Sequence, residues 1–266
     1  MLNIGLIGGD FQHAYSSTLW KHPNLVEWHK GKVLEKTFFI DQAIIDNINT
    51  TGTEKYGWVV ESRIIIPWVI KAFKENYKEI SKSYKYVFTH YKELYDLAEN
   101  FIYFPPHGFW INEPKIYPKT KIISMISSDK NFGPGHTIRL NYVKKFRNKL
   151  DLFGRNIKTI ERKEEALCDY MFSVTIENDQ YETYWTEKIL DCFVSGTVPV
   201  YLGSPDIGNF FNMDGIILLT DNFDPSTLSY DRYISMMPAI QDNFERAIKF
   251  NNIEDLIYSK YLNKGI

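Results

Sequence analysis

The sequence predicts an α/β fold in which parallel sheets are covered by helices. Ten short runs rich in β-branched, aromatic and aliphatic residues recur along the 266 residues, and amphipathic segments of helix length separate several of them. The chain is 44% hydrophobic and 24% charged, as is usual for a globular protein with one large or two ordinary domains. We therefore expect βαβ units.

In the first half, five runs are expected to be strands: 3–7, 36–40, 57–61, 85–90 and 101–105. Between them, a helical pattern from Ile70 to Tyr84 places apolar residues at one set of positions and lysines at the others. A lysine stripe can bind the phosphates of a polymer. A solvated helix face is the simpler interpretation here, because the net charge is only −2.

The stretch from Ile111 to Lys121 is the best candidate linker, since it holds two prolines and mixed charge between two strand runs. It divides the chain into residues 1–115 and 116–266. Each part reads as an α/β domain, and the C-terminal helix is expected to pack back on the first domain.

In the second half, the expected strands are 121–126, 150–154, 171–176, 197–203 and 215–220. Ligands of open α/β sheets bind beyond the carboxyl ends of strands, where helix N-termini offer free N–H groups to anions. After the loop 129–135, a helix is predicted to begin near Thr137, with Arg139 in its first turn. A second helix is predicted from near Tyr184 to Gly196. A third is predicted after Ser204, as N-cap, and Pro205.

This edge of the sheet would present Arg139, Lys188 and helix N-termini to one ligand, an arrangement that suits a diphosphate. The Glu187 carboxylate can accept two hydrogen bonds from a vicinal diol such as ribose. The competing interpretation is structural, because Glu–Lys neighbours are common on helix surfaces and Arg139 can be one more surface cation.

The sequence lacks the motifs of several other classes, which excludes a P-loop enzyme and argues against a Rossmann oxidoreductase and a metal-dependent sugar-nucleotide transferase. It has no GxGxxG, no GxxxxGK[ST], no Asp-x-Asp pair, and no metal-spaced pair among its six histidines. A nucleotide diphosphate bound here would need cationic side chains rather than a metal, so no cofactor and no metal site are expected. The balanced charge argues against nucleic acid as a partner.

The N-terminus is a poor signal peptide, and no window has the roughly 18 apolar residues of a membrane span. A soluble, cytoplasmic protein without a transmembrane segment is expected. Its two cysteines, Cys168 and Cys192, lie in apolar patterns and are expected to be buried thiols.

The segment from Asp169 to Pro205 resembles the donor-binding core of glycosyltransferase family 10, the α-1,3/1,4-fucosyltransferases. In that family a strand ends in Phe-Glu-Asn, and Tyr-x-Thr-Glu-Lys, a helix and a strand ending in Pro-x-x-x-Gly follow. The residues that match are Glu177, Asn178, Tyr184, Thr186, Glu187, Lys188, Pro199 and Gly203. Ile176 and Trp185 depart from the pattern. The resemblance extends over 58–211, and the upstream arginine of the family matches Arg139.

The resemblance implies the GT-B fold, with two facing Rossmann-like domains, a GDP-sugar donor and inversion at the anomeric carbon. It implies an enzyme of glycan biosynthesis that moves a sugar, L-fucose first of all, from GDP-fucose to a hydroxyl of a glycan acceptor. Donor binding is assigned to Arg139 and to the matching residues Asn178, Tyr184, Thr186, Glu187, Lys188 and Gly203.

The family's proposed catalytic base lies in a Glu-Ser-Pro segment, which Glu61-Ser62 resembles, although Arg63 replaces the proline. Glu61 is therefore the candidate base. A structural pairing of Glu61 with Arg63 is the alternative. Two other functions stay open: a related transferase that uses another GDP-sugar, and a glycan- or nucleotide-binding protein without transfer activity.

Overall fold

The computed structural model describes residues 1–8, 16–18, 21–128 and 134–263, and its chain divides into two compact units. Unit 1 comprises residues 1–108 together with 252–266, and unit 2 comprises residues 109–251. The segment 109–115, which the sequence analysis placed in the first domain, groups with unit 2. The physical reason is that Phe109 and Ile111 are buried in a cluster with side chains of unit 2 such as Phe193.

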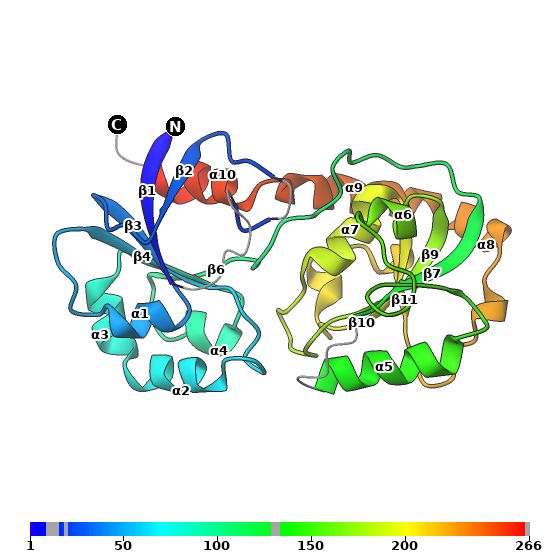
Figure 1. Ribbon diagram of the computed structural model, residues 1–266, viewed down its shortest axis with the longest axis horizontal. Coiled ribbons are helices and arrows are strands. Elements are labelled where there is room, and N and C mark those ends of the chain that lie inside the picture. The colour runs from blue at the N-terminus through cyan, green and yellow to red at the C-terminus, as the bar shows by residue number, and fades with distance from the viewer. Residues whose placement is uncertain (9–15, 19–20, 129–133, 264–266) are drawn as a thin grey trace. The chain divides into compact units, whose positions relative to one another are not determined.

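Unit 1 contains a six-stranded parallel sheet in the order β2-β1-β3-β4-β5-β6. Its helices α1 to α4 gather on one face, and α10 lies on the other (Figure 1). The strands are β1 (Leu2–Ile7), β2 (Val26–Lys30), β3 (Lys36–Ile40), β4 (Glu54–Val59), β5 (Tyr86–Thr89) and β6 (Phe101–Tyr103). The helices are α1 (Gln42–Asp46), α2 (Pro67–Glu75), α3 (Tyr77–Ser83), α4 (Lys92–Tyr95) and α10 (Ile253–Ile257).

The period of two in the strands assigns side chains to these two faces. On one face Phe38 stacks on Tyr56 and Phe88, with ring centroids 5.0 and 5.9 Å apart, and Tyr261 packs against Phe88. On the other face Gly57 leaves room for Val87 and for Ile44 of α1. The sheet is therefore covered on both sides.

Unit 2 contains a five-stranded parallel sheet in the order β11-β10-β9-β7-β8. All seven residues of β9 are buried, because helices cover both faces of the sheet. The strands are β7 (Lys121–Ile126), β8 (Asp151–Phe153), β9 (Tyr170–Ile176), β10 (Val198–Leu202) and β11 (Ile217–Leu218). The helices are α5 (Pro134–Phe146), α6 (Glu164–Leu167), α7 (Glu187–Ser195), α8 (Tyr230–Ser235) and α9 (Met237–Ala247).

The strand order of unit 2 reverses between β7 and β9. The chain leaves β7 through α5 toward β8 on one side, and it leaves β9 through α7 toward β10 on the other. In open parallel sheets such a reversal opens a crevice at the carboxyl ends of the two strands, where ligands bind. The fold therefore predicts a binding site beyond Ile126 and Ile176.

Several elements differ from the sequence-based prediction. β2 was not predicted, because its sequence VEWHK mixes polar residues into an edge strand. The single helix expected over 70–84 is two helices, which meet at Asn76. The α-helix expected after β10 is also wrong. Every residue from Gly203 to Phe211 is described, and this stretch holds only a turn and a 3-10 helix (Ile207–Asn209).

The two helices that leave the crevice also begin at other residues than expected. α5 begins at Pro134, not near Thr137, so Arg139 lies in its second turn. α7 begins at Glu187, not near Tyr184, because Thr186 is its N-cap and accepts a hydrogen bond from the Lys188 N–H. It ends at Gly196 as expected, where φ is +72°. Most of the predicted loop 129–135 lies outside the described residues.

In the described part of the chain, no helix is long and apolar enough to cross a lipid bilayer. Cys192 is buried, whereas Cys168 is only partly so, which corrects the expectation of two buried thiols. Burial raises the pKa of the Cys192 thiol to about 12 and that of Cys168 to about 11. Both thiols are thus protonated near neutral pH.

Candidate functional site

A cavity of about 300 Å³ opens in unit 2 at the crevice between β7 and β9. Its walls come from both strand ends, from α5 and α7, and from the segments around residues 110 and 163–167. The charged and polar side chains that line it include three cations and two carboxylates: Arg139, Lys163, Lys188, Glu187, Asp191, Asn178, His136 and Ser128. All of these residues belong to unit 2, so the cavity is formed within one sheet and its helices.

Arg139 projects from α5 to the end of β9 and is 6% exposed. Its guanidinium donates to the Ile176 carbonyl at 2.8 Å and to Asn178 Oδ1 at 2.9 Å. Burial lowers the pKa of Arg139, and the nearby Glu177 and Glu187 carboxylates oppose that shift. The arginine stays a cation at neutral pH, because its ordinary pKa is above about 12. It is held in place with donors left to face the cavity.

The first turn of α5 packs directly on the backbone of residues 177 and 178. A Cβ atom added to Gly135 would lie 2.4 Å from the Asn178 carbonyl oxygen and 2.5 Å from that of Glu177. Only glycine allows this approach. The glycine therefore sets the distance between the start of α5 and the end of β9, and with it the position of Arg139 over Asn178.

Behind the cavity wall, the Glu177 carboxylate is buried and ties β9 to α7. It accepts the Thr186 N–H at 3.0 Å and the Thr186 hydroxyl at 2.8 Å, and Lys188 Nζ lies 3.6 Å from it. Burial raises the pKa of Glu177, while Lys188 opposes the rise. Gly203 packs directly against the Glu177 side chain, because a Cβ at residue 203 would lie 2.6 Å from Glu177 Cγ.

Glu187 opens the first turn of α7 between two lysines. Its Oε1 lies 3.3 Å from Lys188 Nζ and 3.5 Å from Lys163 Nζ. The carboxylate is only 10% exposed in its side chain, and both lysines are more exposed than it is. The three side chains form an alternating row of charge along the cavity wall, near the N-terminus of α7.

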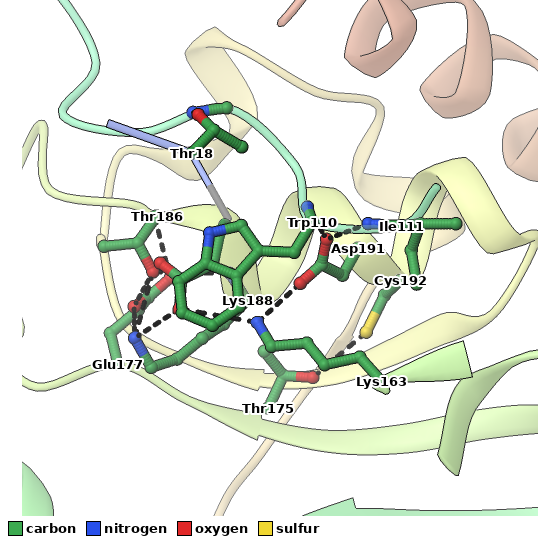
Figure 2. A network of polar contacts seen from close by, with 12 residues as sticks. Thr18, Trp110, Ile111, Lys163, Thr175, Glu177, Thr186, Lys188, Asp191 and Cys192 are labelled. Carbon is green, nitrogen blue, oxygen red and sulfur yellow. Dashed lines mark hydrogen bonds and ion pairs between the residues drawn. The ribbon is translucent and has the colours of Figure 1, made fainter. Parts of the chain in front are cut away.

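Asp191 lies one helical turn further along α7 and is fully buried. Its carboxylate accepts the backbone N–H groups of Trp110 at 2.5 Å and Ile111 at 3.3 Å. It also forms an ion pair of 2.6 Å with Lys163. Lys163 lies between Asp191 and the Trp110 indole, whose centroid is 4.2 Å from Nζ (Figure 2). Burial raises the pKa of Asp191 to about 6, although Lys163 opposes this shift.

The structure thus brings together four of the sequence-predicted donor residues, namely Arg139, Asn178, Glu187 and Lys188. The other three are not among the described residues that line the cavity. Thr186 caps α7, Gly203 packs behind Glu177, and Tyr184 is 3% exposed in the connection that precedes the helix. Their assignment to donor binding stays a prediction.

Glu61 lies in unit 1, two residues after the end of β4. Its Oε1 accepts the Ser62 N–H at 2.8 Å. Arg63, the alternative partner, has its guanidinium 3.8 Å from Glu93 instead. Among the residues that the structure describes, no lysine or arginine forms an ion pair with Glu61, which is partly exposed.

Sequence reasoning did not find Lys163, Asp191 and Trp110. Lys163 belongs to the charged run 161–165, which reads as a solvated surface, and Asp191 lies 28 residues away in α7. The only signal was a lone aspartate inside the amphipathic pattern of α7. Its position among buried residues predicts a charged partner.

Comparison with known proteins identifies the family. Residues 116–251, which include the whole cavity except Trp110, match the family described as glycosyltransferase family 10 (fucosyltransferase), C-terminal part. The chain belongs to glycosyltransferase family 10. The match extends over the sheet of unit 2 and its helices, so the motif residues and the crevice are those of a family 10 protein.

Two relatives support this assignment at the level of sequence. The family 10 chain is 39% identical over 83 residues to the α-(1,3)-fucosyltransferase FucT of Helicobacter pylori, which covers 30% of the chain and 16% of the relative. It is 43% identical over 65 residues to a putative fucosyltransferase-like protein of Arabidopsis thaliana, which covers 23% of the chain and 13% of the relative. The aligned regions are thus a small part of each relative's length.

Solved structures support the fold. A crystal structure of an α1,3-fucosyltransferase with GDP matches 98% of this family 10 chain and 88% of its own, with a TM-score of 0.53 and 15% identity. A second α1,3-fucosyltransferase structure matches 99% and 90%, also with a TM-score of 0.53, at 14% identity. The predicted GT-B class, with two α/β units built on parallel sheets, is confirmed.

Proposed function

We propose that this family 10 chain is an inverting glycosyltransferase that moves L-fucose from GDP-fucose to a hydroxyl of a glycan acceptor. The observation that carries the proposal is the cavity between β7 and β9. It holds Arg139, Lys163 and Lys188 at the carboxyl edge of the sheet, next to the N-terminus of α7. Cations and helix N–H groups suit a diphosphate. The relative from Helicobacter pylori and a structural neighbour with GDP point to the same donor class.

In the proposed reaction, the acceptor hydroxyl attacks C1 of the sugar while its proton passes to a carboxylate. The new C–O bond forms on the face opposite the diphosphate, and the bond between C1 and the diphosphate oxygen breaks. GDP leaves with the bonding electron pair. Negative charge grows on its phosphate oxygens, and Arg139 and Lys188 stabilise it. Glu61 is the proposed base, and Asn178 and Glu187 are proposed to orient donor hydroxyls.

We propose that no metal is essential for this reaction. The sequence has no Asp-x-Asp pair, and the described residues include no group of three or more His, Cys, Asp or Glu side chains placed to hold an ion. Two lysines and an arginine supply the positive charge instead.

The test is mass spectrometry of products from a panel of GDP-sugars on a glycan array, with Glu61→Gln as the matched inactive control. We expect transfer from GDP-fucose, with turnover at least about a hundredfold lower in the control. Transfer from another GDP-sugar alone would establish the related transferase. Tight GDP binding without any transfer would establish the binding protein.

A further inference from the structure

The turn that carries Glu61 is fixed from both sides by the strands next to β4. β3 lies on one side of β4 and β5 on the other, and each places a side chain against the turn from its carboxyl end. The turn itself is well packed, since Ser62 is fully buried. These contacts belong to unit 1 alone.

From the side of β3, the Asp41 carboxylate holds the start of the turn. Its Oδ1 accepts the Val60 N–H at 2.8 Å and the Glu61 N–H at 3.3 Å. The Asp41 N–H in turn donates to the Trp58 carbonyl at 3.1 Å, which extends the β3–β4 ladder to this point. One residue therefore fixes both the end of β4 and the backbone of the proposed base.

The backbone of Asp41 is strained, with φ 48° and ψ −114°. Non-glycine residues rarely adopt such a conformation, and where they do it is often part of a functional site. Asp41 is also the N-cap residue of α1, a position where aspartate usually accepts an N–H of the helix. Here it makes no such bond. Its carboxylate instead accepts the backbone N–H groups of Val60 and Glu61.

From the side of β5, the Tyr91 hydroxyl holds the end of the turn. Tyr91 is fully buried. Its oxygen accepts the Arg63 N–H, and its hydroxyl donates to the Glu61 carbonyl at 3.4 Å. Together with Asp41, it leaves the backbone at residues 60–63 little freedom, while Glu61 itself stays partly exposed.

We infer that Asp41 and Tyr91 are positioning residues that hold Glu61 in the orientation needed to take the proton of the acceptor hydroxyl. This inference rests on the proposed function, in which Glu61 is the base. The hydrogen bonds that both residues make to the turn involve its backbone and not the Glu61 carboxylate, so neither is proposed to take part in the proton transfer itself. Both act through Glu61, so their effect depends on the presence of its carboxylate.

The test is a double-mutant cycle in the full chain, with kcat and the donor KM measured for fucosyl transfer. Asp41→Gly removes the carboxylate and relieves the strained φ, so the variant should melt within about 4 °C of the parent. We expect kcat to fall about 10- to 100-fold with donor KM unchanged, because the donor cavity belongs to unit 2. Asp41→Asn keeps an acceptor oxygen and should restore most of kcat.

On the Glu61→Gln background, Asp41→Gly should change kcat by less than about twofold, since the residue it positions no longer accepts a proton. Tyr91→Phe removes a single hydroxyl. Combined with Glu61→Gln, it gives a second double-mutant cycle, in which we expect a smaller loss of kcat than for Asp41→Gly. The matched control is Asp46→Ala, which deletes an exposed carboxylate of α1 in the same unit and should leave kcat unchanged on both backgrounds.

The outcomes separate the two proposals. Equal losses on the parent and Glu61→Gln backgrounds, in a protein that transfers sugar, would overturn this inference and leave the proposed function standing. The inference also fails, with the proposed function intact, if Asp41→Gly and Tyr91→Phe both transfer at the parent rate. A parent protein that transfers no sugar from any GDP-sugar would overturn both.

Discussion

At the residue scale, the lysines that line the cavity are also the partners of buried carboxylates. Lys188 is 25% exposed in its side chain and lines the cavity, and it also contacts the Glu177 and Glu187 carboxylates. Lys163 and Asp191 form a second such pair. These pairings decide what each substitution should do.

Lys188→Ala should weaken GDP binding by about 1.5–3 kcal/mol, the value of one hydrogen bond to a charged group. The dissociation constant measured by calorimetry would rise about 10- to 150-fold. Lys144→Ala is the matched control, because Lys144 lies on the exposed side of α5 in the same unit. Equal affinity of the parent and Lys188→Ala would remove Lys188 from the donor site.

Asp191 gives a prediction about pH. Its folded pKa of about 6 lies above the ordinary value of 3.8, so between these values the folded protein binds a proton that the unfolded chain does not. Folding is therefore favoured as the pH falls through 6, and the contribution is lost above it. Asp191→Asn lacks this titration.

The parent should thus gain stability relative to Asp191→Asn as the pH is lowered from 7 to about 4.5. Within this range the gain is about 1.4 kcal/mol for each pH unit below the folded pKa. Urea unfolding of both proteins across this range measures it. A constant difference between the two proteins would show that Lys163 keeps Asp191 ionised throughout.

At the element scale, the contact between α5 and the end of β9 depends on Gly135. Gly135→Ala should lower the melting temperature and weaken GDP binding together, because the new Cβ meets backbone that cannot rotate away. Gly208→Ala is the matched control, since its Cβ would meet only the flexible Met213 side chain at 3.1 Å. Parent-like GDP affinity in Gly135→Ala would show that α5 does not set the position of Arg139.

Most strands could be predicted from the sequence, because a buried parallel strand is a short apolar run whatever surrounds it. The starts of α5 and α7 could not. Local pattern cannot tell that Trp185 is buried in an extended connection rather than in a helix turn, since its partners Phe211 and Phe250 come from far along the chain. The edge strand β2 was missed for a related reason, as only pairing with β1 makes it a strand.

The candidate site in unit 2 was partly predictable from the sequence. Asn178 follows the end of β9, Glu187 and Lys188 begin α7, and Arg139 lies in the second turn of α5. Their place at the carboxyl edge of the sheet follows from the topology. Lys163 reaches the cavity from the start of the short helix α6, which the sequence analysis did not predict. Its role depends on a long-range ion pair that no periodicity encodes.

At the scale of the whole molecule, the proposed donor class can be tested by ligand-dependent melting. GDP should raise the melting temperature, because a ligand that binds only the folded state stabilises it by mass action, and UDP should do so much less. Equal shifts from the two nucleotides would contradict the guanine assignment.

Turnover should also persist in EDTA, since cationic side chains are proposed to carry the charge of the leaving diphosphate. The assay compares initial rates with and without chelator, and with manganese added back. Complete loss in EDTA that manganese restores would show that a metal ion does what is assigned here to Arg139 and Lys188.

Unit 1 is assembled from two stretches of chain that unit 2 interrupts. Asp255 accepts the N–H groups of Asn24 and Leu25 at 3.0 and 2.8 Å, and Glu254 accepts that of Ser17. During synthesis on the ribosome, these acceptors emerge only after all of unit 2. The loop at Asn24 therefore gains these hydrogen-bond acceptors only at the end of synthesis, although its own strands are among the first to be translated.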